Sequence, residues 1–171
     1  MKKIEYEAIA CIGKNREIGK NGKLLFHIKE DMDTFTQLTK LDVVVMGRKT
    51  WESLNKKPLP YRTNIVLTHD KEFHPDGAFV FNSVEDMEKF IAEYFADSIV
   101  WIIGGESVYK EFLPKCANLM LTEVDAEDGE ADACFPDFRD DYMEAWRSDE
   151  MTDKKTKLKF VYKFYRRKNG K

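Results

Sequence analysis

Two stretches of the chain share one pattern, in which an apolar run stops at glycine and continues at once into a helix-forming segment. The first is VVVMGRKTWESL, residues 43–54, and the second is VWIIGGESVYKEFL, residues 100–113. A strand that ends in glycine before a helix presents unpaired backbone N–H groups, and the helix dipole favours an anion there. The repeated pattern therefore predicts an α/β fold with two candidate anion sites.

Short apolar runs continue along the whole chain. Strand signals lie at residues 6–13, 42–47, 63–68, 78–81, 98–104, 118–124, 144–151 and 158–167. Helical patterns lie between them, at residues 30–40, 50–54, 83–95 and 106–113. Near-continuous apolar strands joined by helices are typical of a parallel sheet that is covered on both faces. The polar run TDKKTK joins the last two strands and predicts an antiparallel hairpin. We expect a single α/β domain over residues 1–171.

Charge and composition exclude several classes of protein. The net charge is −3, which argues against broad binding of nucleic acid or membrane surfaces. No apolar stretch approaches the roughly 18 residues of a spanning helix. The three cysteines, Cys11, Cys116 and Cys134, are odd in number and far apart, so a disulfide framework is not expected. These features favour a cytoplasmic protein, and the lack of an apolar surface stripe favours a monomer.

The two glycine turns carry different side chains. Arg48 and Lys49 follow the first glycine and would supply fixed positive charge for a dianionic phosphate. The Gly104–Gly105 pair would let the backbone approach a pyrophosphate closely. Thr68 and His69, just past another strand, could line the same patch. Strands often end in glycine and Arg-Lys pairs are usually solvated, but the recurrence of the pattern favours a ligand with several phosphates.

Other site patterns fail on spacing. There is no G-x-G-x-x-G or G-x-x-x-x-G-K-[ST] motif. Tyr109 stands where a hydrolase nucleophile elbow needs glycine, which argues against a serine hydrolase. Gly129 is one position early for an EF-hand loop. The histidines have no metal-ligand spacing, so no metal site is expected: His27, His69 and His74.

Asp31 is the most informative single residue. It lies on the same helical face as Phe35 and Leu38, where a carboxylate is costly unless it is paired or protonated. The simpler interpretation is that Asp31 lies in the first helical turn and only complements the helix dipole. Its position after the long segment at residues 14–29 favours a buried acid that binds a ligand.

Five ordered motifs make the chain resemble dihydrofolate reductase of the bacterial type. They are VVVMGRKTWESL, PLPYRTNIVLT, IIGGESVY, LTEVDAE and CFPDF. The resemblance implies an eight-stranded, mostly parallel sheet with an antiparallel C-terminal hairpin and four flanking helices. It also implies reduction of 7,8-dihydrofolate to 5,6,7,8-tetrahydrofolate, with NADPH as cofactor and antifolates as inhibitors.

The resemblance assigns substrate roles to residues from several segments. Asp31 becomes the catalytic acid, which pairs with the pterin amino group and N3 and favours protonation at N5 through water. Thr122 is expected to hydrogen-bond Asp31, and Arg62 to hold the glutamate carboxylate. The remaining expected substrate contacts, through side chains or main-chain carbonyls, are Ile9, Cys11, Phe26, Phe35, Leu54 and Ile103.

The cofactor roles follow from the same comparison. The first turn would bind the 2′-phosphate, and the glycine pair, implied to be joined by a cis peptide bond, would lie beside the nicotinamide and pyrophosphate. The expected cofactor residues are Cys11, Ile18, Gly19, Gly47, Arg48, Lys49, Thr50, Thr68, His69, Ile103, Gly104, Gly105, Glu106, Ser107, Val108 and Tyr109. Leu24 belongs to the loop that closes over the nicotinamide, and Asp132 is expected to support that loop.

The chain departs from the family pattern before its acid helix. Leu25 and Phe26 replace the usual proline and tryptophan, and Lys29 replaces a frequent proline. The family tryptophan donates its indole N–H to a water near the acid, whereas Phe26 has no donor. Glu106 and Ser107 stand where small and basic residues are common.

Two other functions remain as alternatives. The reductase of riboflavin synthesis shares the fold and the cofactor turn, but the helix with Asp31 and Phe35 favours folate. A catalytically silent nucleotide-binding module would not require both Asp31 and Thr122. Loss of NADPH in the presence of dihydrofolate separates the three.

Overall fold

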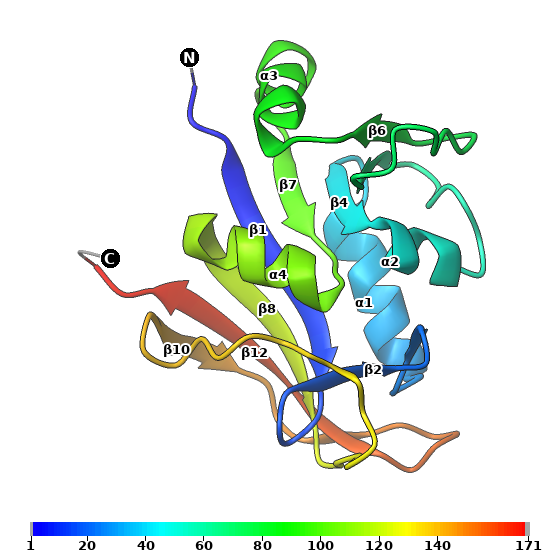
Figure 1. Cartoon of the computed structure of the whole chain (residues 1–171). Coiled ribbons are helices and arrows are strands. Elements are labelled where there is room, and N and C mark those ends of the chain that lie inside the picture. The colour runs from blue at the N-terminus through cyan, green and yellow to red at the C-terminus, as the bar shows by residue number, and fades with distance from the viewer. Residues whose placement is uncertain (1, 170–171) are drawn as a thin grey trace.

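The apolar runs of the chain assemble into one central sheet. In the computed structural model, which describes residues 2–169, its strands are β1 (Glu5–Ile12), β4 (Val43–Gly47), β5 (Thr63–Leu67), β6 (Phe79–Phe81), β7 (Ile99–Ile102), β8 (Cys116–Val124), β10 (Tyr142–Arg147) and β12 (Lys159–Arg167). They lie in the order β10–β12–β8–β1–β7–β4–β5–β6 (Figure 1). A ninth, short strand, β11 (Met151–Thr152), pairs only with β12.

Most strand pairs are parallel, as the helical connections predict. All pairs from β8 through β1, β7, β4 and β5 to β6 are parallel. The pairs β8–β12 and β10–β12 are antiparallel. The expected eight-stranded, mostly parallel sheet with an antiparallel C-terminal end is therefore confirmed.

Helices cover both faces of the sheet because successive strand side chains point to opposite sides. Val43 and Val45 of β4 pack in the core cluster that holds α3 (Val84–Tyr94) and α4 (Glu106–Phe112). Val44 and Met46 pack in the cluster that includes side chains of α1 (Lys29–Thr39) and α2 (Arg48–Ser53). The four expected helices are confirmed, and a 3₁₀ turn at Leu113–Lys115 follows α4.

Two long segments contain more regular structure than expected. Residues 14–29 and 125–141 were predicted as irregular loops, but they contribute β2 (Glu17–Lys20), β3 (Lys23–Leu24) and β9 (Ala133–Cys134). These strands form a second sheet in the order β3–β2–β9. The prediction missed them because each strand is too short for a periodic pattern, and the pairing joins distant parts of the chain.

One further expected strand is divided. Residues 144–151 were predicted as one strand, but β10 ends at Arg147 and β11 begins at Met151. The Ser148 backbone N–H donates to the Tyr162 carbonyl oxygen at 2.9 Å in between. The TDKKTK run joins β11 to β12, so the predicted antiparallel hairpin is present with a shorter first strand.

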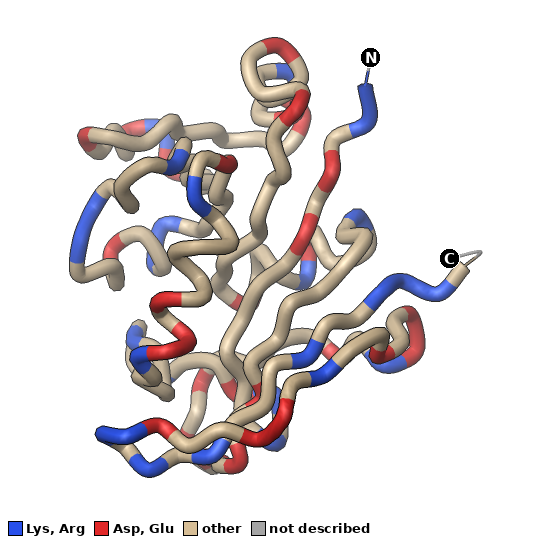
Figure 2. Tube along the Cα trace, turned by 180° about the vertical axis from the view of Figure 1, so that it is seen from behind, with Lys and Arg blue, Asp and Glu red and all other residues tan. Residues whose placement is uncertain are grey.

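Charged residues of both signs lie along most segments of the chain (Figure 2). In residues 2–169, no helix is long and apolar enough to cross a membrane.

Leu41, just after α1, carries a backbone strain that can be removed. Its φ is 70° and its side chain is 76% exposed, so the conformation is not compensated by apolar burial. A left-handed conformation costs a non-glycine residue roughly 1–2 kcal/mol, of which the greater chain entropy of unfolded glycine offsets part. We expect Leu41→Gly to raise the free energy of unfolding by about 0.5–1 kcal/mol, as measured by urea denaturation.

Leu38 provides the matched control for this substitution. It lies inside α1 and is 38% exposed, so Leu38→Gly is expected to destabilise the protein by about 1 kcal/mol. A loss of stability in both variants would show that Leu41 is not strained.

Candidate active site

The carboxyl ends of β4, β5 and β7 open onto a cavity of about 1000 Å³. Every residue that the resemblance assigns to the cofactor lines this cavity, and so do the two loop residues Leu24 and Asp132. Parallel strands end at the same edge of a sheet, which is where open α/β folds bind ligands. The cavity therefore gathers the expected cofactor residues from several separate segments.

The two glycine turns lie side by side at this edge. The Gly47 N–H donates to the Gly104 carbonyl oxygen at 2.9 Å. Gly47 precedes α2 and Gly105 precedes α4, and neither helix start has a side-chain cap. Gly104 has a φ of 119°, and a Cβ there would lie 3.2 Å from the Tyr109 ring. The peptide bond between Gly104 and Gly105 is cis.

Arg48 is engaged by two carboxylates at the first turn. Its Nε donates to Glu52 Oε1 at 2.8 Å, and its Nη1 donates to Asp70 Oδ2 at 2.6 Å. The guanidinium carbon lies 4.3 Å from the centroid of the Phe73 ring. The neighbouring Lys49 is exposed and has no ion pair with any described carboxylate. The two cations that sequence reasoning treated as a pair thus have different surroundings.

Asp31 lies in the first turn of α1 and accepts a hydrogen bond from the Thr122 hydroxyl. Burial raises the pKa of the Asp31 carboxyl, while hydrogen bonds from Thr122 and the Cys11 thiol lower it. The helical face predicted around it is only partly correct: Phe35 is half-buried, but Leu38 is exposed. The raised pKa has the physical origin expected of a ligand-binding acid.

A row of hydrogen-bonding side chains crosses the sheet below α1. Strand register pairs Cys11 of β1 with Thr122 of β8, and Thr122 with Tyr162 of β12. The Tyr162 hydroxyl lies 3.1 Å from the Thr34 hydroxyl, one helical turn beyond Asp31. Burial raises the pKa of Tyr162. Sequence reasoning missed Tyr162, because only the register between β8 and β12 places it near the acid. It also missed Thr34, one helical turn from Asp31 on α1.

The apolar residues expected at the substrate pack on the face of the sheet that holds α1 and α2. Ile9 belongs to the buried cluster there, and Phe35, Leu54 and Ile103 pack against it. The Tyr109 hydroxyl donates to the Ile9 carbonyl oxygen at 2.8 Å. Of this group only Ile103 also lines the large cavity, so it joins the two parts of the site.

Arg62 lies beside the same apolar face. Its Nε donates to the Pro60 carbonyl oxygen at 2.9 Å, and its Nη1 donates to Thr39 Oγ1 at 3.2 Å. The guanidinium carbon is 5.7 Å from the Phe35 ring centroid, and burial lowers the pKa of Arg62. These contacts orient the side chain and leave part of its N–H fork available.

Phe26 is buried in a third apolar cluster with Ile28, Val124 and Phe160. Cys11 packs against this cluster from the side of the acid. The ring therefore shares a cluster with Cys11, whose thiol hydrogen-bonds Asp31, and as a hydrocarbon it offers the acid no hydrogen bond.

Asp132 contacts the segment that resembles the closing loop. Its Oδ2 accepts from the Asn21 backbone N–H at 2.8 Å, and its own N–H donates to the Gly19 carbonyl oxygen at 3.1 Å. Leu24, at the end of β3, is 50% exposed and borders the cavity. The pairing of β2 with β9 adds further hydrogen bonds between the two loops.

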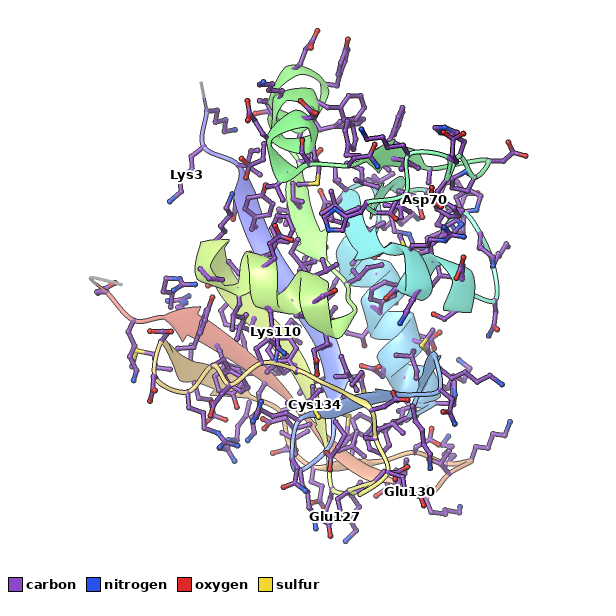
Figure 3. The ribbon with its side chains drawn as sticks, in the orientation of Figure 1. Lys3, Asp70, Lys110, Glu127, Glu130 and Cys134 are labelled. Atoms are coloured by element: carbon purple, nitrogen blue, oxygen red, sulfur yellow. The ribbon has the colours of Figure 1, made fainter. Side chains whose placement is uncertain are left out.

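Glu106 begins α4 directly after the glycine pair. Its Oε1 accepts from the Cys134 N–H at 2.7 Å, and its Oε2 lies 3.3 Å from Lys110 Nζ. Hydrogen bonding from the Cys134 backbone, with a smaller contribution from Lys110, lowers the pKa of Glu106. The carboxylate is held by β9, although Glu106 also borders the cavity. Figure 3 shows Lys110 and Cys134 on the α4 side of the molecule.

Sequence reasoning missed one segment of the cavity wall. Residues 81–84, from the end of β6 to the start of α3, line it. The Ser83 hydroxyl oxygen caps α3 by accepting from the Asp86 N–H at 3.2 Å. The polar residues between strand and helix at 82–83 were the available signal, because this too is a strand-to-helix turn at the carboxyl edge.

No group of three or more metal-ligating side chains occurs within residues 2–169, and all three cysteines are free.

Comparisons with known proteins agree with one another. The sequence pattern of the dihydrofolate reductase family matches residues 5–167. The chain is 38% identical over 154 residues to dihydrofolate reductase HdrB of Haloferax volcanii, covering 85% of this chain and 78% of the relative. It is 36% identical to the Neisseria gonorrhoeae dihydrofolate reductase over 153 residues, 90% of each chain.

A solved structure extends this agreement to the fold. The Enterococcus faecalis dihydrofolate reductase, complexed with NADP(H) and RAB-propyl, superposes with a TM-score of 0.87 at 31% identity. The match covers 96% of this chain and 97% of that one. The match over residues 5–167, the identity to dihydrofolate reductases of other organisms and the shared fold together show that this chain belongs to the dihydrofolate reductase family.

Proposed function

We propose that Asp31 is the acid with which this dihydrofolate reductase holds the pterin ring of 7,8-dihydrofolate during its NADPH-dependent reduction. The observation that carries the assignment is the half-buried Asp31 carboxyl that accepts a hydrogen bond from Thr122. A carboxylate presents two oxygens, so it can accept from a ring N–H and an amino group together. Thr122 orients the carboxylate for this contact.

Asp31 also favours the proton transfer that accompanies reduction. Partial burial raises the pKa of the Asp31 carboxyl, so it keeps a proton closer to neutral pH than an exposed carboxyl does. We propose that Asp31 favours protonation of N5 through water, which makes C6 a better hydride acceptor. Bound NADPH supplies that hydride.

The main-chain carbonyls of Ile9 and Ile103 complete the recognition of the ring system. The Ile9 carbonyl already accepts from the Tyr109 hydroxyl, and its second lone pair remains for a ligand N–H. Phe35 and Leu54 then contact the pterin and benzoyl groups, and Arg62 the glutamate carboxylate. Their common packing on the α1 and α2 face supports this arrangement.

We assign the large cavity to NADPH. The uncapped starts of α2 and α4 offer backbone N–H groups to phosphate oxygens, and the glycines let the pyrophosphate approach the backbone. Arg48 and Lys49 lie where they can bind the 2′-phosphate, with Thr68 and His69 on the same wall. Asp132 supports the loop over the nicotinamide through Gly19 and Asn21.

A turnover assay tests this function directly. The purified protein should consume NADPH when dihydrofolate is present and not when dihydrofolate is omitted. Consumption with a substrate of riboflavin synthesis instead would indicate the related reductase. Cofactor binding without turnover of either substrate would indicate a silent module.

Phe26→Trp tests the missing donor near the acid. An indole N–H restored to the water network stabilises the charged carboxylate, so the pKa that governs hydride transfer should fall. The larger ring enters a buried cluster, and overpacking costs about 1–3 kcal/mol of stability. The measurement is the pH dependence of the pre-steady-state hydride-transfer rate.

Phe26→Leu is the control, because it changes the shape of the wall without adding a donor. An unchanged or higher pKa in a folded Phe26→Trp variant would show that residue 26 does not tune Asp31.

We also propose that the protein acts as a cytoplasmic monomer. Its three free cysteines suit a reducing compartment, and sedimentation velocity measures the oligomeric state.

A further inference from the structure

We propose that Asp70 limits the preference of this enzyme for NADPH over NADH by competing with the 2′-phosphate for Arg48. The inference rests on the proposed role of Arg48 as the phosphate-binding cation. Asp70 lies just beyond β5, on the side of the molecule that carries α2 and β6 (Figure 3). Its carboxylate already accepts a hydrogen bond from the cation that we propose binds the phosphate.

The Arg48 guanidinium is held in one orientation. Glu52, on the same helix α2, accepts a hydrogen bond from the Arg48 Nε. Asp70 accepts one from the Arg48 Nη1 at 2.6 Å. The Phe73 ring lies below the guanidinium at 4.3 Å. A guanidinium has five N–H donors, so these contacts leave others for a phosphate. Any phosphate bound there lies next to the Asp70 carboxylate and is repelled by it.

Asp70 cannot turn away without losing a second contact. Its Oδ1 accepts from the Glu72 N–H at 2.9 Å, while its Oδ2 faces Arg48. The Glu72 N–H, followed by Arg48, lowers the pKa of Asp70, so the carboxylate is charged throughout the physiological pH range. Competition with the phosphate is therefore permanent.

The two cations make unequal contributions as a result. Lys49 is exposed and has no ion pair with a carboxylate in the described part of the chain, so its charge acts on the phosphate undiminished. Part of the Arg48 charge is offset by Asp70. Asp70 does not repel NADH, because NADH carries a ribose 2′-hydroxyl from which a carboxylate can accept a hydrogen bond. Asp70 thus weakens NADPH binding and leaves NADH binding unaffected or improved.

The test compares the specificity constants for NADPH and NADH in Asp70→Asn. Asparagine keeps an oxygen for the Glu72 N–H and removes the charge. We expect the Michaelis constant for NADPH to fall roughly three- to tenfold, with that for NADH unchanged or raised. Low ionic strength should enlarge the effect, because the interaction is between exposed charges.

Three further variants make the outcome decisive. Asp76→Asn removes the same charge from the same loop, where the exposed Asp76 has no ion pair with a described residue. This variant should leave the ratio of the specificity constant for NADPH to that for NADH unchanged. Arg48→Gln should lower that ratio, and Asp70→Asn should add nothing in the Arg48→Gln background.

An unchanged or lower ratio in Asp70→Asn, while Arg48→Gln loses its preference for NADPH, would overturn the role of Asp70 alone. An unchanged ratio in Arg48→Gln would overturn the phosphate assignment and this inference with it. Equal effects of Asp76→Asn and Asp70→Asn would show a general effect of net charge and would also overturn it.

Discussion

Asp31→Asn is expected to lower the rate of hydride transfer to dihydrofolate by roughly 10²–10⁴-fold, the usual contribution of a positioned acid or base. Asparagine keeps an oxygen for the Thr122 hydroxyl but lacks the charge and the acidic proton of the carboxyl group. The measurement is the single-turnover rate with NADPH and dihydrofolate. A rate within about threefold of the unmodified protein would refute the assignment.

Asp33→Asn is the matched control for this prediction. Asp33 lies on the same helix, but its side chain is exposed and pairs with Lys29 at 2.7 Å. Removing this charge alters the net charge equally without touching the pocket, so the hydride-transfer rate should not change. A comparable loss in both variants would mean that the effect comes from the charge of α1 rather than from Asp31.

Although Asp31→Asn is expected to lose activity, its stability at pH 7 should be unchanged or higher. Burial raises the pKa of the Asp31 carboxyl above its unfolded value, so the folded chain binds the proton more tightly. Stability then falls as pH rises from the unfolded to the folded pKa. Asparagine has no charge to bury, so thermal unfolding at pH 7 should occur at the same or a higher temperature. This measurement also establishes that lost activity is not lost folding.

Neutralising Arg48 and Lys49 together, as Arg48→Gln with Lys49→Gln, should raise the Michaelis constant for NADPH by roughly 10–100-fold. Hydrogen bonds between charged groups contribute about 1.5–3 kcal/mol, and both cations proposed to bind the phosphate are removed. The constant for NADH should change little, because NADH lacks the 2′-phosphate. The salt dependence of NADPH binding should become flatter.

A control for this double variant comes from the turn between β11 and β12. Lys154 and Lys155 are both exposed there, so changing both to glutamine removes the same charge far from α2. The ratio of the two Michaelis constants should then stay as it is in the unmodified protein. Equal losses for NADPH and NADH in the Arg48 and Lys49 variant would mean that this turn does not recognise the phosphate.

Much of the fold follows from local pattern. The strand-glycine-helix stretches, the apolar runs and the helical segments between them predict the parallel sheet, the four helices and the edge at which ligands bind. These features are predictable because burial imposes a repeat of two residues on a strand and 3.6 on a helix. The same reasoning made Asp31 a candidate from its predicted helical face, of which Phe35 is half-buried and Leu38 exposed.

The details of the site depend on contacts that no local pattern records. The Asp31–Thr122 hydrogen bond joins residues 91 apart, and the Arg48–Asp70 pair joins residues 22 apart. The family resemblance supplied the first of these expectations, but nothing in the sequence pointed to the second. Tyr162 comes near the acid only through the register of β12 on β8.

The sequence by itself therefore determined the architecture, and it predicted the two glycine turns and Asp31 as candidate site residues. The tertiary structure alone decided that β2, β3 and β9 form a second sheet beside the cavity and that Arg48 is already paired. The physical reason is the sequence separation of the residues that interact. Periodicity reports the burial of neighbouring residues, whereas pairing between segments depends on strand register and on the path of each loop, which are set by packing of the whole chain.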